Sequence, residues 1–136
     1  MNRIFVDTNI VIDLLAKRAT FYTEAAKLFS LSDRNEIQLF ISSLTFANTN
    51  YVLSKHFSPK EAREILRKFK VLVNVLSLDD KIIDLALSDE MFADFEDGLQ
   101  YYTALESNID VILTRNKKDF KYSRIPVLTA KEYLVA

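Results

Sequence analysis

Three short stretches of the chain concentrate the residues that could do chemistry. The first is Val6-Asp7-Thr8-Asn9, where an apolar run leads straight into an acid. The second is Asp94-Phe95-Glu96-Asp97-Gly98, and the third is Thr114-Arg115-Asn116 with the basic residues that follow it. Carboxylates held close together repel one another unless a cation relieves the repulsion. The stretches therefore raise the hypothesis of a site built from acids around a cation.

Asp7 follows the apolar run Ile4-Phe5-Val6, which predicts a buried strand ending at Asp7. The wider apolar spacing after it predicts a short helix from Asn9 to about Ala16. In open parallel sheets, ligands bind at the carboxyl ends of the strands. We therefore expect Asp7 to lie where chemistry is usually done, with the later acids converging on it.

Asp94 and Asp97 are expected in the first turn of a helix that runs from about Asp94 to Ser107. Three residues apart, they share a helix face, whereas Glu96 points about 160° away from Asp94. The alternative interpretation is an acid-rich first turn on a solvated face, which the helix dipole favours by roughly 0.3–1 kcal/mol. Gly98, the only glycine of the chain, suggests a close approach of backbone or ligand, or close packing against a strand.

The third stretch begins where the strand expected at 109–114 ends, on the same side of a parallel sheet as Asp7. Asn116 could hold a water or a metal-bound water through its side chain, or simply shape a turn. Arg115, Lys117 and Lys118 are expected as surface cations of this loop.

Strands and helices alternate along the whole sequence, which predicts a single domain over residues 1–136 with an α/β fold and a mainly parallel sheet. The helix expected at 43–56 carries the apolar residues Phe46, Tyr51, Val52 and Leu53. The expected strands are 3–7, 37–41, 71–78, 109–114 and 125–128. The remaining expected helices are 20–31, 60–70 behind a Ser58 cap, one capped by Asp79 or Asp80 with Ile82, Ile83, Leu85, Ala86 and Leu87 as its core residues, and a short one after Thr129.

The composition excludes several classes of function. The net charge is -1 over 136 residues, so any contact with nucleic acid must come from a local patch. The chain has no cysteine, which rules out disulfides, thiol catalysis and Cys-ligated zinc. Its one histidine, His56, is expected at the surface. No export signal or run of 18 apolar residues is present, so we expect a cytoplasmic protein without a membrane span.

Taken together and in this order, the three stretches, the last with Asp119-Phe120, resemble the PIN-domain family and its VapC-like toxin ribonucleases. The resemblance implies a three-layer α/β/α fold with a central sheet of four to five strands. It also implies that Asp7 and Asp97 are ligands of Mg²⁺ or Mn²⁺, that Asp94 is an additional acid of the cluster, and that Asn116 belongs to the site.

The function implied by the resemblance is a metal-dependent endoribonuclease that hydrolyses RNA phosphodiester bonds, as the toxin of a VapBC-type toxin–antitoxin pair. A small antitoxin and a second copy of the chain are the implied protein partners. The basic helix at 61–70 is expected as a solvated face, whereas Lys17, Arg18 and the third-stretch cations lie nearer the proposed site. Phosphate contacts of this kind carry little sequence information.

Two departures from the family pattern keep an alternative open. Asn48 stands where PIN domains commonly carry a glutamate, and Asn116 stands where an aspartate is frequent. Asp94 would restore a third carboxylate. The alternative is a PIN-like module with weakened catalysis that binds RNA or a protein. A response-regulator-like domain with an acidic pocket is disfavoured, because no suitable lysine follows the last main strand and Arg115 cannot act as the same compact charge.

Overall fold

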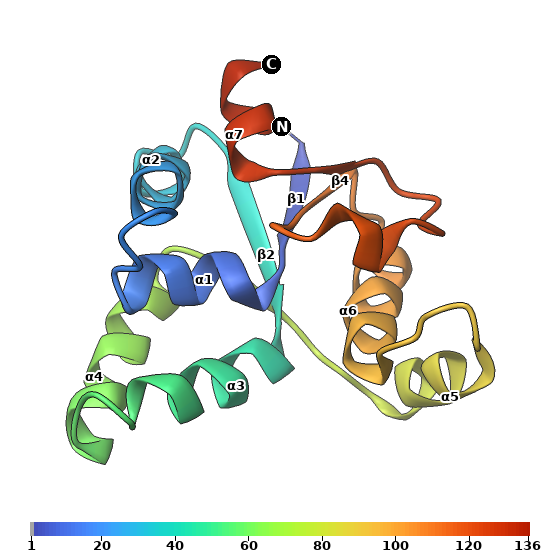
Figure 1. The fold of residues 1–136 in the computed structure, drawn as a ribbon, viewed down its shortest axis with the longest axis horizontal. Coiled ribbons are helices and arrows are strands. Elements are labelled where there is room, and N and C mark those ends of the chain that lie inside the picture. The colour runs from blue at the N-terminus through green and yellow to red at the C-terminus, as the bar shows by residue number, and fades with distance from the viewer. Residues whose placement is uncertain (1) are drawn as a thin grey trace.

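The computed structural model describes residues 2–136, and its helices and strands alternate as the sequence predicts (Figure 1). In chain order, the elements are β1 (Arg3–Val6), α1 (Thr8–Leu15), α2 (Tyr22–Asp33), β2 (Gln38–Ser42), α3 (Ser43–Leu53), α4 (Pro59–Lys70), β3 (Asn74–Leu76), α5 (Asp80–Ser88), α6 (Phe95–Glu106), β4 (Val111–Leu113), the 3-10 helix η1 (Lys117–Phe120), β5 (Val127–Leu128) and α7 (Ala130–Val135).

The five strands form one sheet in the order β3-β2-β1-β4-β5, and every neighbouring pair is parallel. The central strand β1 pairs with β2 on one side and with β4 on the other. The carboxyl ends of these three strands therefore lie side by side at one edge. The predicted three-layer α/β/α class with a parallel sheet is confirmed.

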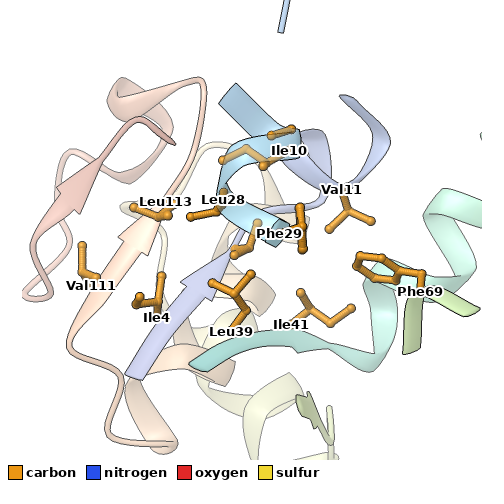
Figure 2. Packing of buried hydrophobic residues seen from close by; sticks show 12 residues of the cluster. Ile4, Ile10, Val11, Leu28, Phe29, Leu39, Ile41, Phe69, Val111 and Leu113 are labelled. Atoms are coloured by element: carbon orange, nitrogen blue, oxygen red, sulfur yellow. The ribbon is translucent and has the colours of Figure 1, made fainter. Parts of the chain in front are cut away.

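Side chains alternate across the sheet and define the two helical layers. Ile4 and Val6 of β1 face α1 and α2, together with aliphatic residues of β2 and β4 (Figure 2). Phe5, between them, faces the opposite layer and packs with Tyr101 and Ala104 of α6. Figure 1 shows α1 and α2 on one side of the strands and α6 on the other. Burial on both faces explains why β1 is an unbroken apolar run.

The helix starts predicted from capping residues are confirmed. Ser58 forms a capping box with Glu61, with Pro59 in the first turn of α4. Asp79 and Thr129 accept hydrogen bonds from backbone N–H groups at the starts of α5 and α7. None of the helices within residues 2–136 combines the length and apolar character needed to cross a membrane.

The predicted strand 71–78 is much shorter in the structure. Only Asn74–Leu76 pairs with β2, and the Val71 side chain is 84% exposed. The backbone N–H groups of Val71 and Leu72 still bond to carbonyls of α4, so this valine-rich segment is the turn that leaves the helix. The strands predicted at 109–114 and 125–128 likewise shorten to β4 and β5.

The predicted core of α5 is also partly wrong. Ile82 and Ala86, four residues apart, are buried against α6, whereas Ile83 and Leu87 are 38% and 65% exposed. Residues 82–87 include five apolar side chains spread around the helix, but the neighbouring helix covers only one face of it. Apolar density alone therefore overestimated the buried surface of α5.

Candidate active site

A groove of about 380 Å³ lies at the carboxyl edge of the sheet and brings the acidic stretches together. Asp7 follows β1, Asp94 and Asp97 open α6, and Asp119 comes from η1. The groove is lined by Asp7, Thr8, Asn9, Ile12, Leu44, Asn48, Tyr51, Val52, Asp94, Glu96, Asp97, Gln100 and Asp119. The predicted convergence of Asp7, Asp94 and Asp97 is thus present as shared lining of one groove.

Asp7 is held in place by both of its carboxylate oxygens. Its Oδ1 accepts a hydrogen bond from the backbone N–H of Thr8 at 2.9 Å, because Asp7 caps α1. Its Oδ2 accepts one from Oγ1 of Thr114, also at 2.9 Å. Burial raises the pKa of Asp7, while the two hydrogen bonds act in the opposite direction. The carboxylate is therefore fixed in one orientation at the junction of β1, β4 and α1.

Asn116, predicted as a site residue, lies beside this junction rather than in the groove. Its side chain is exposed and is not among the groove-lining residues. Its backbone N–H donates to Oγ1 of Thr114 at 3.1 Å, so the residue touches the group that orients Asp7. The turn of η1 then carries the next acid, Asp119, into the groove.

Asp94 and Asp97 occupy the N-terminal end of α6 as predicted. Asp94 is the N-cap, and its Oδ1 accepts a hydrogen bond from the backbone N–H of Glu96 at 2.8 Å. Glu96 also lines the groove, which corrects the expectation that it points away. The helical angle between residues two apart does not apply here, because the Asp94 backbone is extended, with φ -101 and ψ 122.

Repulsion within the groove is strongest at Asp97. Burial of this half-buried side chain, reinforced by the charges of Asp94, Asp119, Asp7 and Glu96, raises the pKa of Asp97 to about 7. No lysine or arginine stands among the groove-lining residues of the part of the chain that the structure describes. The acids of the groove therefore carry negative charge that protein cations leave uncompensated.

A buried polar network supports the floor of the groove. The Gln100 amide Nε2 donates to Oγ1 of Thr8 at 3.0 Å and to Oγ1 of Thr45 at 3.3 Å. Its Oε1 accepts a hydrogen bond from Ser42, and the hydroxyls of Thr8 and Thr45 bond to each other at 2.9 Å. Gln100 thus joins α6 to the first turns of α1 and α3, on which Asp7 and Asn48 depend for their positions.

Asn48 is half-buried and lines the groove from α3. The structure therefore places an amide at the position where the family resemblance leads one to expect a glutamate. Asp119 brings a further carboxylate into the groove from η1, which follows β4. Asp119 belongs to the third motif but was not predicted as a site residue, and its place soon after the end of a strand was the available signal.

Gly98 does not mark a close approach of a ligand. It is buried on α6, and a Cβ at this position would meet the Cβ atoms of Ala86 and Phe92 at 3.6 Å, which is ordinary van der Waals contact. The interpretation as close packing is nearer the structure, although the neighbours are α5 and the segment after it, not a strand.

Arg115 is not the simple surface cation that was predicted. Its Nε lies 2.9 Å from Oδ2 of Asp13, a carboxylate of α1 whose side chain is only 2% exposed. The guanidinium carbon also lies 4.1 Å from the centroid of the Phe21 ring. Arg18 approaches the other oxygen of Asp13 at 3.7 Å. Arg115 therefore ties the loop after β4 to α1, next to Thr114.

The donor set of the groove fits a hard divalent cation in its chemistry. The groove presents carboxylate and amide oxygens, and none of its five acids forms an ion pair within residues 2–136. Across that same range, no three acids or histidines are grouped closely enough to form a complete metal-binding cluster. Mg²⁺ keeps several waters and needs only one or two carboxylates from a protein, so separate acids satisfy it.

Comparison with known proteins gives both a family and a fold. The family model described as PIN domain matches residues 3–118. No curated protein matches the sequence. The fold is similar to that of VapBC-1 from nontypeable Haemophilus influenzae, with a TM-score of 0.71 at 18% identity, covering 95% of this chain and 98% of that chain.

Two further solved structures share the fold. A toxin-antitoxin complex from Klebsiella pneumoniae has a TM-score of 0.68 at 24% identity, covering 93% of this chain and 97% of that chain. VapC20 from Mycobacterium tuberculosis, described as a sarcin-ricin loop cleaving toxin, has a TM-score of 0.69 at 16% identity, covering 88% and 94%. At these identities the likeness establishes a common fold.

Proposed function

We propose that this chain, which belongs to the PIN domain family, is a metal-dependent endoribonuclease that hydrolyses RNA phosphodiester bonds. The match over residues 3–118 confirms the family predicted from the three motifs, and it makes the response-regulator-like alternative wrong. The observation that carries the proposal is the single groove that Asp7, Asp94, Asp97 and Asp119 share.

The proposed metal ligands are Asp7 and Asp97, with Asp94 as an additional acid. Asp7 is oriented by Thr114 and by its place at the start of α1. Burial and the charges of the neighbouring acids raise the pKa of Asp97 to about 7, and a bound cation would relieve the repulsion among these acids. A bound Mg²⁺ or Mn²⁺ supplies a water of lowered pKa and offsets negative charge on the phosphate.

Residues beside and beneath the groove serve this chemistry by positioning the acids. Thr114 holds Asp7, and the Asn116 N–H holds Thr114, so Asn116 acts as a positioning residue. Gln100 fixes Thr8 and Thr45 beneath the groove. Asp119 comes from η1, later in the sequence than the other acids of the groove. Its charge contributes to raising the pKa of Asp97.

We also propose that the chain is the toxin of a toxin–antitoxin pair. The similar fold from Klebsiella pneumoniae is described as a toxin-antitoxin complex, which supports a small antitoxin as partner. A basic side chain of that antitoxin would complement the acidic groove. A homodimer is proposed on the family resemblance alone, and sedimentation of the purified chain tests it.

The direct test of the enzymatic proposal is cleavage of single-stranded RNA by the purified protein in the presence and absence of divalent cation. Cleavage should require Mg²⁺ or Mn²⁺, should stop on chelation and should return when metal is restored. Cleavage that persists unchanged in chelator would contradict the metal-dependent mechanism.

The second candidate is a PIN module that binds RNA or a protein without cleaving it, and Asn48 in the groove favours it. Titration calorimetry with Mn²⁺ separates the two candidates. Binding in the millimolar range or tighter that Asp97→Asn abolishes supports the nuclease. Absence of any binding heat at millimolar Mn²⁺ supports the non-catalytic module.

A further inference from the structure

We infer that Tyr51 and Lys55 form a subsite for one unpaired nucleotide of RNA, with the Tyr51 ring stacked on the base and Lys55 paired with a phosphate. The inference rests on the proposed ribonuclease function, because the subsite belongs to the same groove. It applies to single-stranded RNA, since bases inside a helix are already stacked and a splayed base offers its face to an aromatic ring.

Tyr51 was expected among the apolar residues of its helix, but the structure places it at the surface. Its side chain is 66% exposed, and it lines the acidic groove. On α3 it follows Asn48 by three residues and Leu44 by seven, so all three share one helix face. The step from Asn48 to Tyr51 is about 4.5 Å along the axis. The Tyr51 ring therefore lies about one helical turn along the groove wall from the Asn48 amide. Asn48 is the residue at the position where the family pattern commonly has a glutamate.

The ring is the only aromatic side chain among the groove-lining residues that the structure describes. A large ring that is two-thirds exposed gains little from the core of the protein. Phe46 and Leu53, on other faces of α3, supply the contacts to the core instead. An exposed, rigid aromatic face beside a phosphodiester-cleaving site is the feature that binds bases without regard to their identity.

Lys55 lies in the turn just after α3, four residues beyond Tyr51, and supplies a positive charge that the groove lining lacks. Its Nζ lies 4.4 Å from the centroid of the Tyr51 ring. The groove lining itself is acidic and repels the RNA backbone, so a cation in contact with its aromatic wall marks where a phosphate can be held. A base stacks on the ring surface that the ammonium leaves open, while the ammonium meets the adjoining phosphate.

The chain contains a matched pair away from the groove. Tyr122 is 49% exposed, and Nζ of Lys121 lies 5.1 Å from the centroid of its ring. Tyr122 borders a different, smaller pocket, together with Tyr101 and Arg124. Substitutions at Tyr122 and Lys121 therefore remove the same chemical groups without touching the proposed subsite.

The first test is the kinetics of cleavage of a short single-stranded RNA. Tyr51→Ala should raise KM by about five- to tenfold, the lower range of what loss of one base–aromatic stack produces, with kcat little changed. Tyr51→Phe keeps the ring and should behave as the unmodified protein, as should Tyr122→Ala. Lys55→Ala should raise KM and weaken its dependence on salt. An unchanged KM for Tyr51→Ala would overturn the inference.

The second test uses the absence of tryptophan from the sequence. Tyr51→Trp introduces a single fluorophore, whose emission should be quenched when a short single-stranded RNA binds. A duplex of the same sequence should leave the emission unchanged, and Tyr122→Trp should not respond to either RNA. Emission of Tyr51→Trp that does not change at saturating single-stranded RNA would contradict the subsite.

The two tests separate the subsite from the proposed function. Quenching of Tyr51→Trp without any cleavage would support the subsite and refute the nuclease. Cleavage together with normal KM for Tyr51→Ala and no quenching would keep the nuclease and refute the subsite. If Tyr51→Ala weakens binding of the antitoxin but leaves RNA binding intact, the ring serves a protein contact and the inference is overturned.

Discussion

Thr114 and Asp7 join the carboxyl ends of two neighbouring strands through one hydrogen bond, from Oγ1 of Thr114 to Oδ2 of Asp7 at 2.9 Å. The backbone N–H of Asp7 also donates to the carbonyl of Leu113 at 2.9 Å. Strand pairing and a side-chain contact therefore act on the same residue. The central acid of the groove owes its orientation to β4, far away in sequence.

Thr114→Val should reduce kcat/KM for RNA cleavage by about tenfold, because a hydrogen bond to a charged group contributes about 1.5–3 kcal/mol. Loss of the donor raises the pKa of Asp7 further, so the acid limb of the pH–rate profile should move to higher pH. Thr114→Ser retains the hydroxyl and is the matched control. Equal profiles for the valine and serine variants would show that the hydroxyl does not orient Asp7.

Asp97→Asn should stabilise the metal-free protein above neutral pH while abolishing stabilisation by Mn²⁺. The pKa of Asp97 is raised from 3.8 to about 7, so the native state holds its proton to higher pH than the unfolded chain does. The Asp97 contribution to stability is therefore lost as pH rises through that window. We expect Tm of the variant to exceed that of the unmodified protein by about 2–5 °C at basic pH.

Thermal unfolding at acidic and basic pH, with and without Mn²⁺, measures both effects of Asp97→Asn. The gain in Tm should shrink as pH falls through this window and vanish only below about pH 3, where Asp97 of the unmodified protein is largely protonated in both the native and the unfolded state. A variant that is less stable than the unmodified protein at basic pH in chelator would contradict the repulsion assigned to the groove.

Arg115→Ala should lower the free energy of unfolding by about 2–4 kcal/mol, because it leaves the buried carboxylate of Asp13 without its closest cation. Arg34→Ala is the matched control, since Arg34 and Glu36 form an exposed pair with side chains 60% and 54% exposed. That control should cost less than about 1 kcal/mol. Urea unfolding of the two variants measures the difference. Similar losses in the free energy of unfolding would show that the Arg115–Asp13 pair stabilises the fold no more than an exposed pair does.

Gln100→Leu should destabilise the fold by about 1–3 kcal/mol, because the buried hydroxyls of Ser42 and Thr45 lose a partner. The same change at Gln38, which is exposed at the start of β2, should stay within about 0.5 kcal/mol. Denaturant midpoints of the two variants provide the comparison. A tolerated Gln100→Leu would mean that the network beneath the groove can repack around an apolar side chain.

Local signals in the sequence were sufficient for most of the fold. Ser58, Asp79 and Thr129 cap the helices that they were predicted to start, because capping depends on groups a few residues apart. The strand ends at Asp7 and Thr114 were also predictable, since an apolar run that gives way to polar residues is a short-range pattern. Strand lengths were overestimated where backbone pairing covers only part of an apolar run, as in 71–78.

Features that depend on distant neighbours were out of reach of the sequence. The exposure of Tyr51 and Leu87 reflects which helix face lacks a neighbour, and periodicity does not specify that. The pairing of Arg115 with Asp13 joins a loop to a helix about a hundred residues earlier. Asp119 follows a strand end in the sequence, but its place in the groove also depends on the packing of η1 against α6, which only the three-dimensional structure shows.

The most direct test of the central claim is the rate of metal-dependent RNA cleavage by Asp7→Asn, compared with the unmodified protein and with Asp84→Asn at an exposed position of α5. Asn preserves the size of the Asp7 side chain and removes its charge. The proposed site predicts that Asp7→Asn abolishes cleavage, while Asp84→Asn cleaves at the normal rate. Cleavage by Asp7→Asn at a rate equal to that of the unmodified protein would contradict the assignment of this groove as the active site.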